Sequence, residues 1–284
     1  MYHVRLEKRL AAGVVGLVPH QCALAVQGLV VGRPFIRAVN YHATPEADAG
    51  RFREHLAFYR KHYSDVTYDD LCGLLDHGRW TKPKPGLLLS FDDGYRDNAT
   101  VAAPLLEEFG LTGWFFVPSC FAADGHDGTG GNQPPRPTMT VDQLRQLAKR
   151  HVVGSHTRTH CRLRESVGEA RLRQEIVDSK IDLAALLGRD VETFCWVGGE
   201  EDTYCAAAAR LVEEAGYRFA FMTNSAPTTA RTHPLQIQRS NLEAEYPLSL
   251  VKFQLAGLMD LLYAQKRRRV NAVTGVPPPV PTSR

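Results

Sequence analysis

The sequence predicts an α/β fold, with mainly parallel strands and helices packed outside them. Short apolar segments alternate with segments of helical periodicity over most of the chain, and glycine or proline separates many of them. Polar side chains follow directly on several of the apolar segments. Of the 284 residues, 44% are hydrophobic, which suffices for a substantial core. A (β/α) barrel and a doubly wound sheet both fit this pattern, and both place chemistry at the C-terminal ends of their strands.

Each expected strand is a short apolar run, often bounded by glycine or proline. Two of these runs lead directly into ionisable side chains: one into Asp92 and Asp93, the other into His156 and His160. The expected strands cover residues 35–42, 87–91, 113–117, 152–155, 191–197, 218–222 and 235–239.

Helices are expected where apolar residues recur every three or four positions, as Phe52, Leu56, Tyr59 and Tyr63 do. Thr140 and Ser166 each have a glutamine or glutamate three residues later, which is the spacing of a capping box. Further helices are expected at residues 68–77, 98–109, 205–214 and 248–262.

We divide the chain into three parts. Residues 1–34 form an N-terminal apolar or helical segment, residues 35–263 a catalytic domain, and residues 264–284 a basic, proline-rich tail predicted to be disordered. Residues 122–138 are rich in Gly, Pro, Asp and Asn, which predicts a long loop able to shape a substrate cleft.

The N-terminus and the cysteines bear on localisation. Arg5, Lys8 and Arg9 precede an apolar run at residues 10–18, as in a signal peptide, but Glu7 and the weakly apolar run favour a surface helix. The run is too short to span a bilayer. The six cysteines are scattered without CxxC pairs, which is typical of reduced thiols in a cytosolic protein. We expect a cytoplasmic protein in peripheral contact with a membrane; export by a signal-like segment is the alternative.

The charge balance does not indicate a nucleic-acid partner, and we expect none. The formal net charge of +3 includes five cationic residues after position 263, so the remainder sums to −2 and its net charge implies no basic surface. The five are Lys266, Arg267, Arg268, Arg269 and Arg284, and such a tail can contact an anionic membrane.

Two adjacent carboxylates follow the strand expected at residues 87–91. Asp92 and Asp93 end this apolar run, and Gly94 allows the backbone to turn sharply. The strand would therefore place both carboxylates at its C-terminal end, where a functional site can form. Taken alone, the Asp-Asp-Gly sequence also fits an ordinary polar turn.

Two histidines follow the strand expected at residues 152–155. His156 and His160, with one carboxylate, make a donor set suited to Zn²⁺, Co²⁺ or Fe²⁺ with positions open for water and substrate. By spacing alone either aspartate supplies the carboxylate, and a pair of polar loop histidines is the other interpretation.

Residues 90–94 (Ser-Phe-Asp-Asp-Gly) and 155–160 (Ser-His-Thr-Arg-Thr-His) together resemble the first two motifs of the polysaccharide deacetylase family, the NodB-homology group or carbohydrate esterase family 4. The resemblance covers about residues 36–241. It implies a distorted (β/α) barrel and metal-dependent removal of N-acetyl, or sometimes O-acetyl, groups from sugars. It also implies that Asp92 is the catalytic base and that Asp93, His156 and His160 bind the metal, most commonly Zn²⁺.

The third motif of that family is altered here. Residues 194–199 keep an aromatic residue and the glycines, but Val197 stands where the family has proline. We expect Trp196 and Gly199 of this segment, together with Tyr95, to contact substrate.

The general acid is not evident from the sequence. The Leu-x-His motif that supplies it in the family is absent from the segment expected as the last helix. His42, in a Tyr-His pair at the end of the first strand, is one substitute, and His233 is another. Arg239 is a candidate to orient Asp92 through a bidentate contact. Each of these three also fits a purely structural role.

The sequence therefore predicts a metal-dependent deacetylase acting on an N-acetylated amino sugar in a glycan or glycan precursor. An esterase or other amide hydrolase on the same fold is one alternative, because only an amide leaving group requires strong protonation. A catalytically weakened carbohydrate-binding protein is the other, because the acid and the third motif depart from the family.

Overall fold

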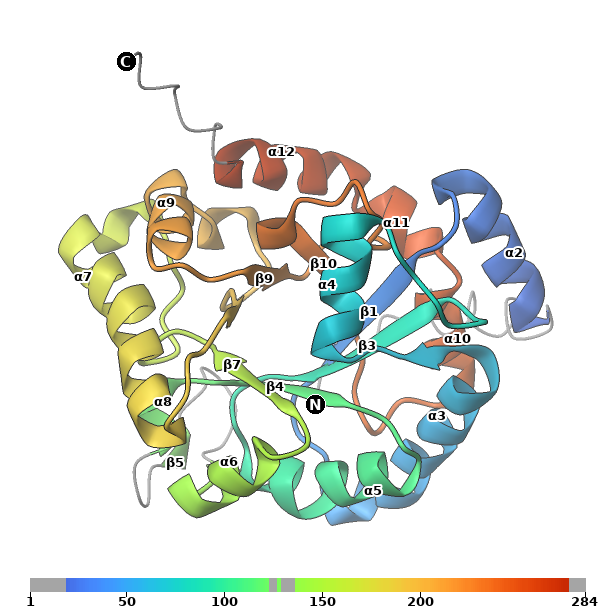
Figure 1. The fold of residues 1–284 in the computed structure, drawn as a ribbon, viewed down its shortest axis with the longest axis horizontal. Helices are drawn as coiled ribbons and strands as arrows, with labels where there is room; N and C mark the ends of the chain where they lie inside the picture. Colours follow the sequence, from blue (N-terminus) through green and yellow to red (C-terminus); the bar gives the residue numbers. More distant parts are fainter. Residues whose placement is uncertain (1–18, 123–126, 129–135, 276–284) are drawn as a thin grey trace.

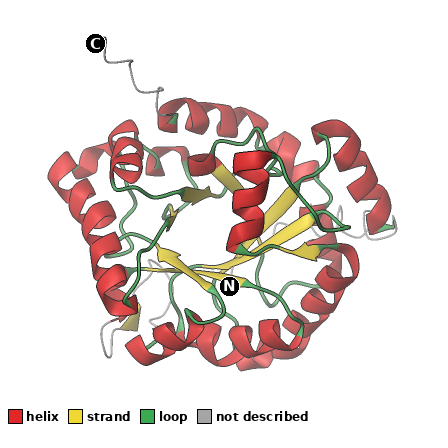
Figure 2. Cartoon of the chain, in the orientation of Figure 1, coloured by secondary structure: helices red, strands yellow, loops and turns green. Residues whose placement is uncertain are grey.

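A closed barrel of parallel strands forms the centre of the protein, and helices surround it (Figures 1 and 2). The computed structural model describes residues 19–122, 127–128 and 136–275. Going round the barrel, the strand order is β1-β10-β9-β8-β7-β4-β3, and the barrel is closed by parallel pairing of β3 with β1. This arrangement confirms the predicted (β/α) barrel. The strands are β1 (Ile36–Tyr41), β3 (Gly86–Phe91), β4 (Gly113–Val117), β7 (Val152–Ser155), β8 (Thr193–Cys195), β9 (Phe219–Met222) and β10 (Ile237–Asn241).

Three short strands lie outside this ring. β2 (Ser64–Asp65) pairs in parallel with the first residues of β3. β5 (Asp127–Gly128) and β6 (Arg136–Pro137) pair with each other in antiparallel fashion.

The helices form the outer layer, and side-chain caps mark the first residues of two of them. Thr140 makes the predicted capping box of α6 with Gln143, and Thr67 makes a further one with Asp70 at the start of α4. Ser166 instead lies in a short 3₁₀ turn before α7. The helices are α2 (His20–Val31), α3 (Ala49–His62), α4 (Tyr68–His77), α5 (Ala103–Glu108), α6 (Val141–Leu147), α7 (Glu169–Arg173), α8 (Ser179–Leu187), α9 (Ala206–Glu214), α10 (Leu248–Leu255), α11 (Leu258–Leu262) and α12 (Ala264–Thr274).

Strand alternation divides the core into two buried clusters. Outward-facing residues pack under the helices, whereas inward-facing residues fill the barrel. The N-terminal half of the barrel is apolar, and α4 closes this end with Leu71 and Leu74 (Figure 1). The inward-facing apolar side chains are Ile36, Ala38, Leu88, Trp114, Phe116, Phe219, Phe221 and Ile237.

The same alternation makes the C-terminal half of the barrel interior polar. Asn40, Ser90, Cys195 and Arg239 occupy later inward positions of their strands and are each at most 1% exposed. Because the strands are parallel, these side chains meet at one end of the barrel. A charged site can therefore form over an apolar floor.

The predicted tail begins too early. Residues 264–274 form helix α12, in which Val270 and Thr274 are 2% exposed. Gln236 Nε2 donates to Thr274 Oγ1 at 2.9 Å, and Lys266 donates to the carbonyl of Gly199. Lys266 and Arg267 thus bind carbonyl groups of the barrel loops, and Arg269 pairs with Glu201. The prediction of disorder from residue 264 is therefore wrong for this helix.

Several predictions concern residues outside the described ranges. The apolar run at residues 10–18 and the proline-rich residues 276–284 lie there, as does most of the long loop at 122–138. Within residues 1–34, helix α2 packs on the barrel, with His20 Nε2 2.7 Å from the hydroxyl of Tyr63. Among the described helices, none combines the length and the apolar character needed to cross a bilayer.

Leu74→Ala should destabilise the protein by about 2–5 kcal/mol, because it opens a cavity where α4 seals the barrel. Urea unfolding measures this difference. His77→Ala, at an exposed position of the same helix, is the control and should change the unfolding free energy by less than about 1 kcal/mol. Equal stability of the two variants would show that α4 does not seal the barrel.

Candidate active site

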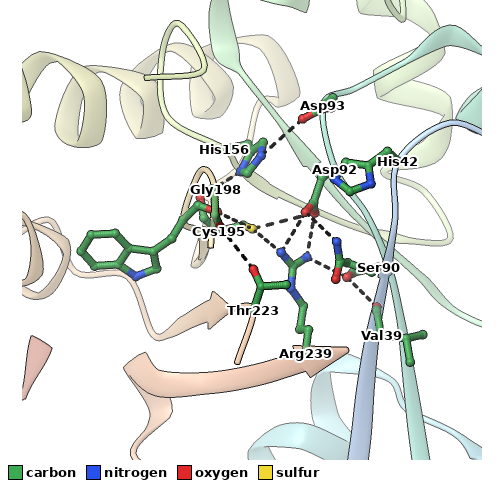
Figure 3. Close-up of polar contacts among 12 residues, drawn as sticks. Val39, His42, Ser90, Asp92, Asp93, His156, Cys195, Gly198, Thr223 and Arg239 are labelled. Carbon is green, nitrogen blue, oxygen red and sulfur yellow. Dashed lines mark hydrogen bonds and ion pairs between the residues drawn. The ribbon is translucent and has the colours of Figure 1, made fainter. Parts of the chain in front are cut away.

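Asp92 and Arg239 form a buried, bidentate ion pair at the C-terminal end of the barrel (Figure 3). Arg239 Nη1 donates to Asp92 Oδ1 at 2.7 Å, and Nη2 donates to Oδ2 at 2.8 Å. Ser90 adds a third contact, since its hydroxyl accepts from Arg239 Nη1 at 2.8 Å and donates to the carbonyl of Val39. The bidentate contact expected from the sequence is thus present, and it fixes the plane of the Asp92 carboxylate.

This pair keeps Asp92 ionised. Burial by itself would raise the pKa of the Asp92 carboxyl, but the Arg239 guanidinium, together with His156 and His42, outweighs burial and holds the pKa below its ordinary value. Asn40 Nδ2 lies 3.5 Å from Asp92 Oδ2, at the limit of a hydrogen bond. An ionised carboxylate in this position is able to accept a proton from a neighbouring group.

Asp93 faces the other way, toward the two histidines. Its Oδ1 lies 3.0 Å from His160 Nε2 and 3.5 Å from His156 Nε2. His156 Nδ1 is 2.9 Å from the carbonyl oxygen of Cys195, so this nitrogen donates and Nε2 is left to face Asp93. Burial would raise the pKa of Asp93, but hydrogen bonds from the histidines hold it well below its ordinary value.

The backbone of this region is held in uncommon conformations. Asp93, Thr157 and His160 have φ angles of 69°, 64° and 60°, in the left-handed region that L-residues rarely adopt. Such conformations cost of order 1–3 kcal/mol each, so surrounding contacts must hold them. They aim the side chains of Asp93 and His160 at each other.

Glu175 supplies such contacts for residues 156–160, which we call the histidine loop. This fully buried carboxylate accepts from the backbone N–H of Arg158 at 3.0 Å and of Thr159 at 2.8 Å, and from the Thr159 hydroxyl at 2.7 Å. Thr157 Oγ1 also accepts from the backbone N–H of Cys161. Three hydrogen bonds to one buried carboxylate therefore hold the segment between the two histidines in place.

The donor set of Asp93, His156 and His160 fits a divalent metal. One ligand atom from each lies within 4.8 Å of the other two. Two imidazoles and one carboxylate suit Zn²⁺, Co²⁺ and Fe²⁺. The hydrogen bond from His156 Nδ1 to a carbonyl is the outer contact that metal-binding histidines commonly make.

A second group of potential ligands, Asp92, His156 and Cys195, is less suitable. Both oxygens of Asp92 already accept from Arg239, and Arg239 Nη2 lies 2.9 Å from Cys195 Sγ. A cation there would meet a guanidinium. Burial raises the pKa of the Cys195 thiol well above its ordinary value, which opposes the thiolate form that binds metals.

His42 lies beside Asp92 (Figure 3), and it pairs with Glu243. His42 follows β1, Glu243 follows β10, and Nδ1 of His42 lies 2.9 Å from Oε1 of Glu243. Burial lowers the pKa of His42, but Glu243, reinforced by Asp93 and Asp92, raises it to about 10. A protonated imidazole is therefore placed beside two ionised carboxylates.

The other predicted site residues lie elsewhere or play a different part. Trp196 faces outward from the end of β8 and is 2% exposed in the core under the helices, because strand alternation turns Cys195 inward instead. Tyr95 is 5% exposed and bridges to Thr138. Gly199 is partly exposed and is held by Lys266. His233 precedes the N-terminal end of β10, whereas the site lies at the C-terminal ends of the strands, so His233 lies away from it.

Three residues that contribute to the site were missed by sequence reasoning: Ser90, Glu175 and Glu243. Ser90 could have been found by counting back two positions along its strand from Asp92. Glu175 and Glu243 carry no local signal, because each acts on residues far away in the sequence.

Known proteins similar to this chain share the same fold. A family model described as polysaccharide deacetylase matches residues 79–220, half of the chain, which includes Asp92, Asp93, His156 and His160. No curated protein matches.

Among solved structures, the chain is similar to the Streptococcus pyogenes deacetylase PplD in complex with acetate, with 19% identity, a TM-score of 0.66, and coverage of 78% of this chain and 98% of that chain. A de-N-acetylase from Aggregatibacter actinomycetemcomitans has 17% identity and a TM-score of 0.64, with 78% and 100% covered. The deacetylase domain of BpsB from Bordetella bronchiseptica has 18% identity and a TM-score of 0.63, with 74% and 96% covered. At these identities the likeness is one of fold.

Arg239→Met should raise the pKa of the Asp92 carboxyl, because burial then acts without the guanidinium that opposes it. Carboxyl ¹³C chemical shifts followed over pH measure the change. Ser90→Ala, which removes a contact of Arg239 but no charge, is the control and should leave this pKa close to its original value.

The same variant tests stability. Because the folded-state pKa of Asp92 is depressed, its contribution is present above the unfolded-state pKa and is lost as pH falls through the folded-state pKa. Arg239→Met should therefore be less stable at neutral pH, by about 3–5 kcal/mol for an uncompensated buried charge. An unchanged Asp92 pKa would contradict the assigned role of Arg239.

Proposed function

The chain belongs to the polysaccharide deacetylase family, a family of carbohydrate hydrolases, and we propose that it hydrolyses the N-acetyl group of an amino sugar in a glycan or glycan precursor. The observation that carries this proposal is the division of labour between two adjacent aspartates. Asp92 is clamped by Arg239, whereas Asp93 faces His156 and His160. One carboxylate is thus available for proton transfer and the other for metal binding.

Asp93, His156 and His160 are the residues that would hold the metal, and we propose Zn²⁺, with Co²⁺ and Fe²⁺ suiting the same donors. When bound, a divalent cation supplies Lewis-acid polarisation of the acetyl carbonyl and of the attacking water. The chain's own contribution is a fixed donor geometry, held by the Glu175 contacts to the histidine loop and by the Cys195 carbonyl on His156.

Asp92 acts as the base in this proposal. Its ionised carboxylate takes the proton of the water that attacks the acetyl carbon, and Arg239 keeps the carboxylate in one orientation while it does so. Arg239 binds both carboxylate oxygens, which favours the ionised form before the reaction and leaves Asp92 a weak base. Such a base would suffice if a cation held by Asp93, His156 and His160 lowered the pKa of the attacking water.

His42 acts as the acid. The amine that leaves an N-acetyl group is a poor leaving group unless it is protonated, so amide hydrolysis requires a proton donor beside the reacting carbon. His42 is protonated at neutral pH because Glu243 raises its pKa to about 10, and it lies at the same end of the barrel as Asp92. Glu243 orients the imidazole through Nδ1.

This arrangement bears on the two alternatives. The carbohydrate-binding alternative rested on the missing acid, and the His42–Glu243 pair supplies a candidate for that role. An esterase needs no such donor, so the presence of a strongly held imidazolium favours an amide substrate.

Asp92→Asn and Asp93→Asn should separate catalysis from metal binding. Asp92→Asn should lower acetate release from an N-acetylated sugar by about 10²–10⁴-fold, while Zn²⁺ affinity stays near the original value, because Asp92 is occupied by Arg239. Asp93→Asn should lower Zn²⁺ affinity by more than the roughly 10–100-fold typical of changing an outer partner.

Acetate release and competitive titration of Zn²⁺ against a chelating dye measure the two effects. If Asp92→Asn lost the metal and Asp93→Asn kept it, the two roles would be reversed. Full turnover by metal-free protein would exclude the proposed function altogether.

His42→Ala should slow hydrolysis of an N-acetyl sugar by about 10²–10⁴-fold and slow hydrolysis of 4-nitrophenyl acetate far less, because nitrophenolate leaves without a proton. The ratio of the two rates measures the requirement for an acid. Similar losses on both substrates would assign His42 a structural role.

Glu243→Gln should lower the pKa of His42 and so move the alkaline limb of the pH–rate profile to lower pH. The limb moves to lower pH because Glu243 is the main group that raises the pKa of His42, and His42 can donate a proton only at a pH below that pKa. A limb that stays in place would show that another group donates the proton.

A further inference from the structure

Six of the eight large hydrophobic side chains that are exposed in the described residues lie on two helices, α2 and α11. On α2 they are Val26, Leu29 and Val30, with exposed fractions of 59%, 86% and 78%. The opposite side of α2 is buried through Leu24, Gln27 and Gly28. Since α2 contains no Asp, Glu, Lys or Arg, its outer face lacks the charged residues that a surface helix normally presents to water.

Helix α11 presents the other three, Leu258, Leu261 and Leu262, of which the last two are 75% and 73% exposed. Their spacing places them on one side of the helix, while Met259 is buried on the other. Isolated exposed leucines are ordinary, but a cluster of six on two neighbouring helices marks an interaction surface.

Buried contacts hold α2 and α11 next to each other, as Figure 1 also shows. Arg37 Nη1 donates to Gln27 of α2 at 3.3 Å and to Asp260 of α11 at 2.6 Å. Gln27 Nε2 also donates to the carbonyl of Leu255 at 2.9 Å. One guanidinium therefore connects both helices from inside and leaves their outer sides exposed. We call the six exposed side chains the α2–α11 apolar surface.

The chain around this surface is cationic. Residues 20–33 contain no acidic residue and one arginine, Arg33. Residues 248–275 contain one acidic residue, Asp260, against five basic ones; Asp260 is paired with Arg37, and Arg269 is paired with Glu201. These segments together have six basic residues and one acidic residue, a formal net charge of +5. The basic residues are Arg33, Lys252, Lys266, Arg267, Arg268 and Arg269.

The charge around the apolar surface favours one of its two possible partners, an anionic bilayer, over the other, a second copy of the chain. A second copy of the chain bound through the same surface would bring two segments of net charge +5 together, which is unfavourable. An anionic bilayer satisfies both features, since its interface takes up the leucine side chains and its head groups attract the arginines.

We propose that the α2–α11 apolar surface docks the protein on an anionic lipid membrane. Leu29, Leu261 and Leu262 enter the head-group region, and Arg33 and Arg268, both exposed, lie near the lipid phosphates. The protein rests on the membrane through folded helices of the barrel's outer layer. The proposal does not depend on the proposed deacetylase activity, and its readout is membrane binding.

Flotation of the full chain with vesicles tests the proposal. Vesicles of equal parts phosphatidylcholine and phosphatidylglycerol should carry the protein, and vesicles of phosphatidylcholine alone should carry much less. Raising the salt should weaken the binding, because ions screen the attraction of head groups for arginine. Joint substitution Leu29→Ser, Leu261→Ser and Leu262→Ser should lower partitioning at least about tenfold.

Two further variants make the test specific. Arg268→Glu should lower partitioning about fivefold or more on anionic vesicles, since each basic residue near the surface contributes on the order of 1 kcal/mol. Ile181→Ser is the matched control, because Ile181 is 60% exposed on α8, outside this surface, and its loss should leave binding unchanged. Unaltered melting temperatures show that the variants fold.

Three outcomes would overturn the proposal. The first is no binding of the unaltered chain to anionic vesicles. The second is binding that the triple variant retains, which would place the contact elsewhere in the chain. The third is a dimer in light scattering that the triple variant abolishes without any vesicle binding, which would assign the surface to a second copy.

Discussion

The buried ion pair between Asp92 and Arg239 is the contact on which the site depends. Two neighbouring carboxylates in a buried position would repel each other and tend to take up a proton, unless each had its own positive partner. Arg239 gives Asp92 that partner inside the barrel, and the two histidines face Asp93. The pair also joins the ends of β3 and β10, the two strands that flank β1.

The barrel makes this separation of roles possible through strand alternation. Asp92 and Arg239 both follow the inward register of their strands, over an apolar floor closed by α4. The residue after Asp92 leaves the strand in a left-handed conformation, which sends Asp93 toward His156 and His160 rather than back into the barrel. One change in backbone conformation therefore directs two identical side chains to different partners, Arg239 and the histidines.

Much of the fold and part of the site could be predicted from the sequence, for local reasons. The strands are short apolar runs, and Asp92, Asp93, His156 and His160 follow two of them, so parallel pairing brings them together. Trp196 was misplaced because its inward or outward direction depends on the register of β8. Glu243 and Glu175 were missed because their partners are distant in sequence. Helix α12 was missed because Arg267 and Arg269 find their carbonyl and carboxylate partners only in the fold.

Anomalous diffraction from crystals soaked with Zn²⁺ tests the central claim most directly. The account predicts one strong peak within bonding distance of Asp93, His156 and His160, with Asp92 still paired to Arg239. A peak instead among Asp92, His156 and Cys195, with Arg239 displaced, would contradict the assignment of separate tasks to the two aspartates.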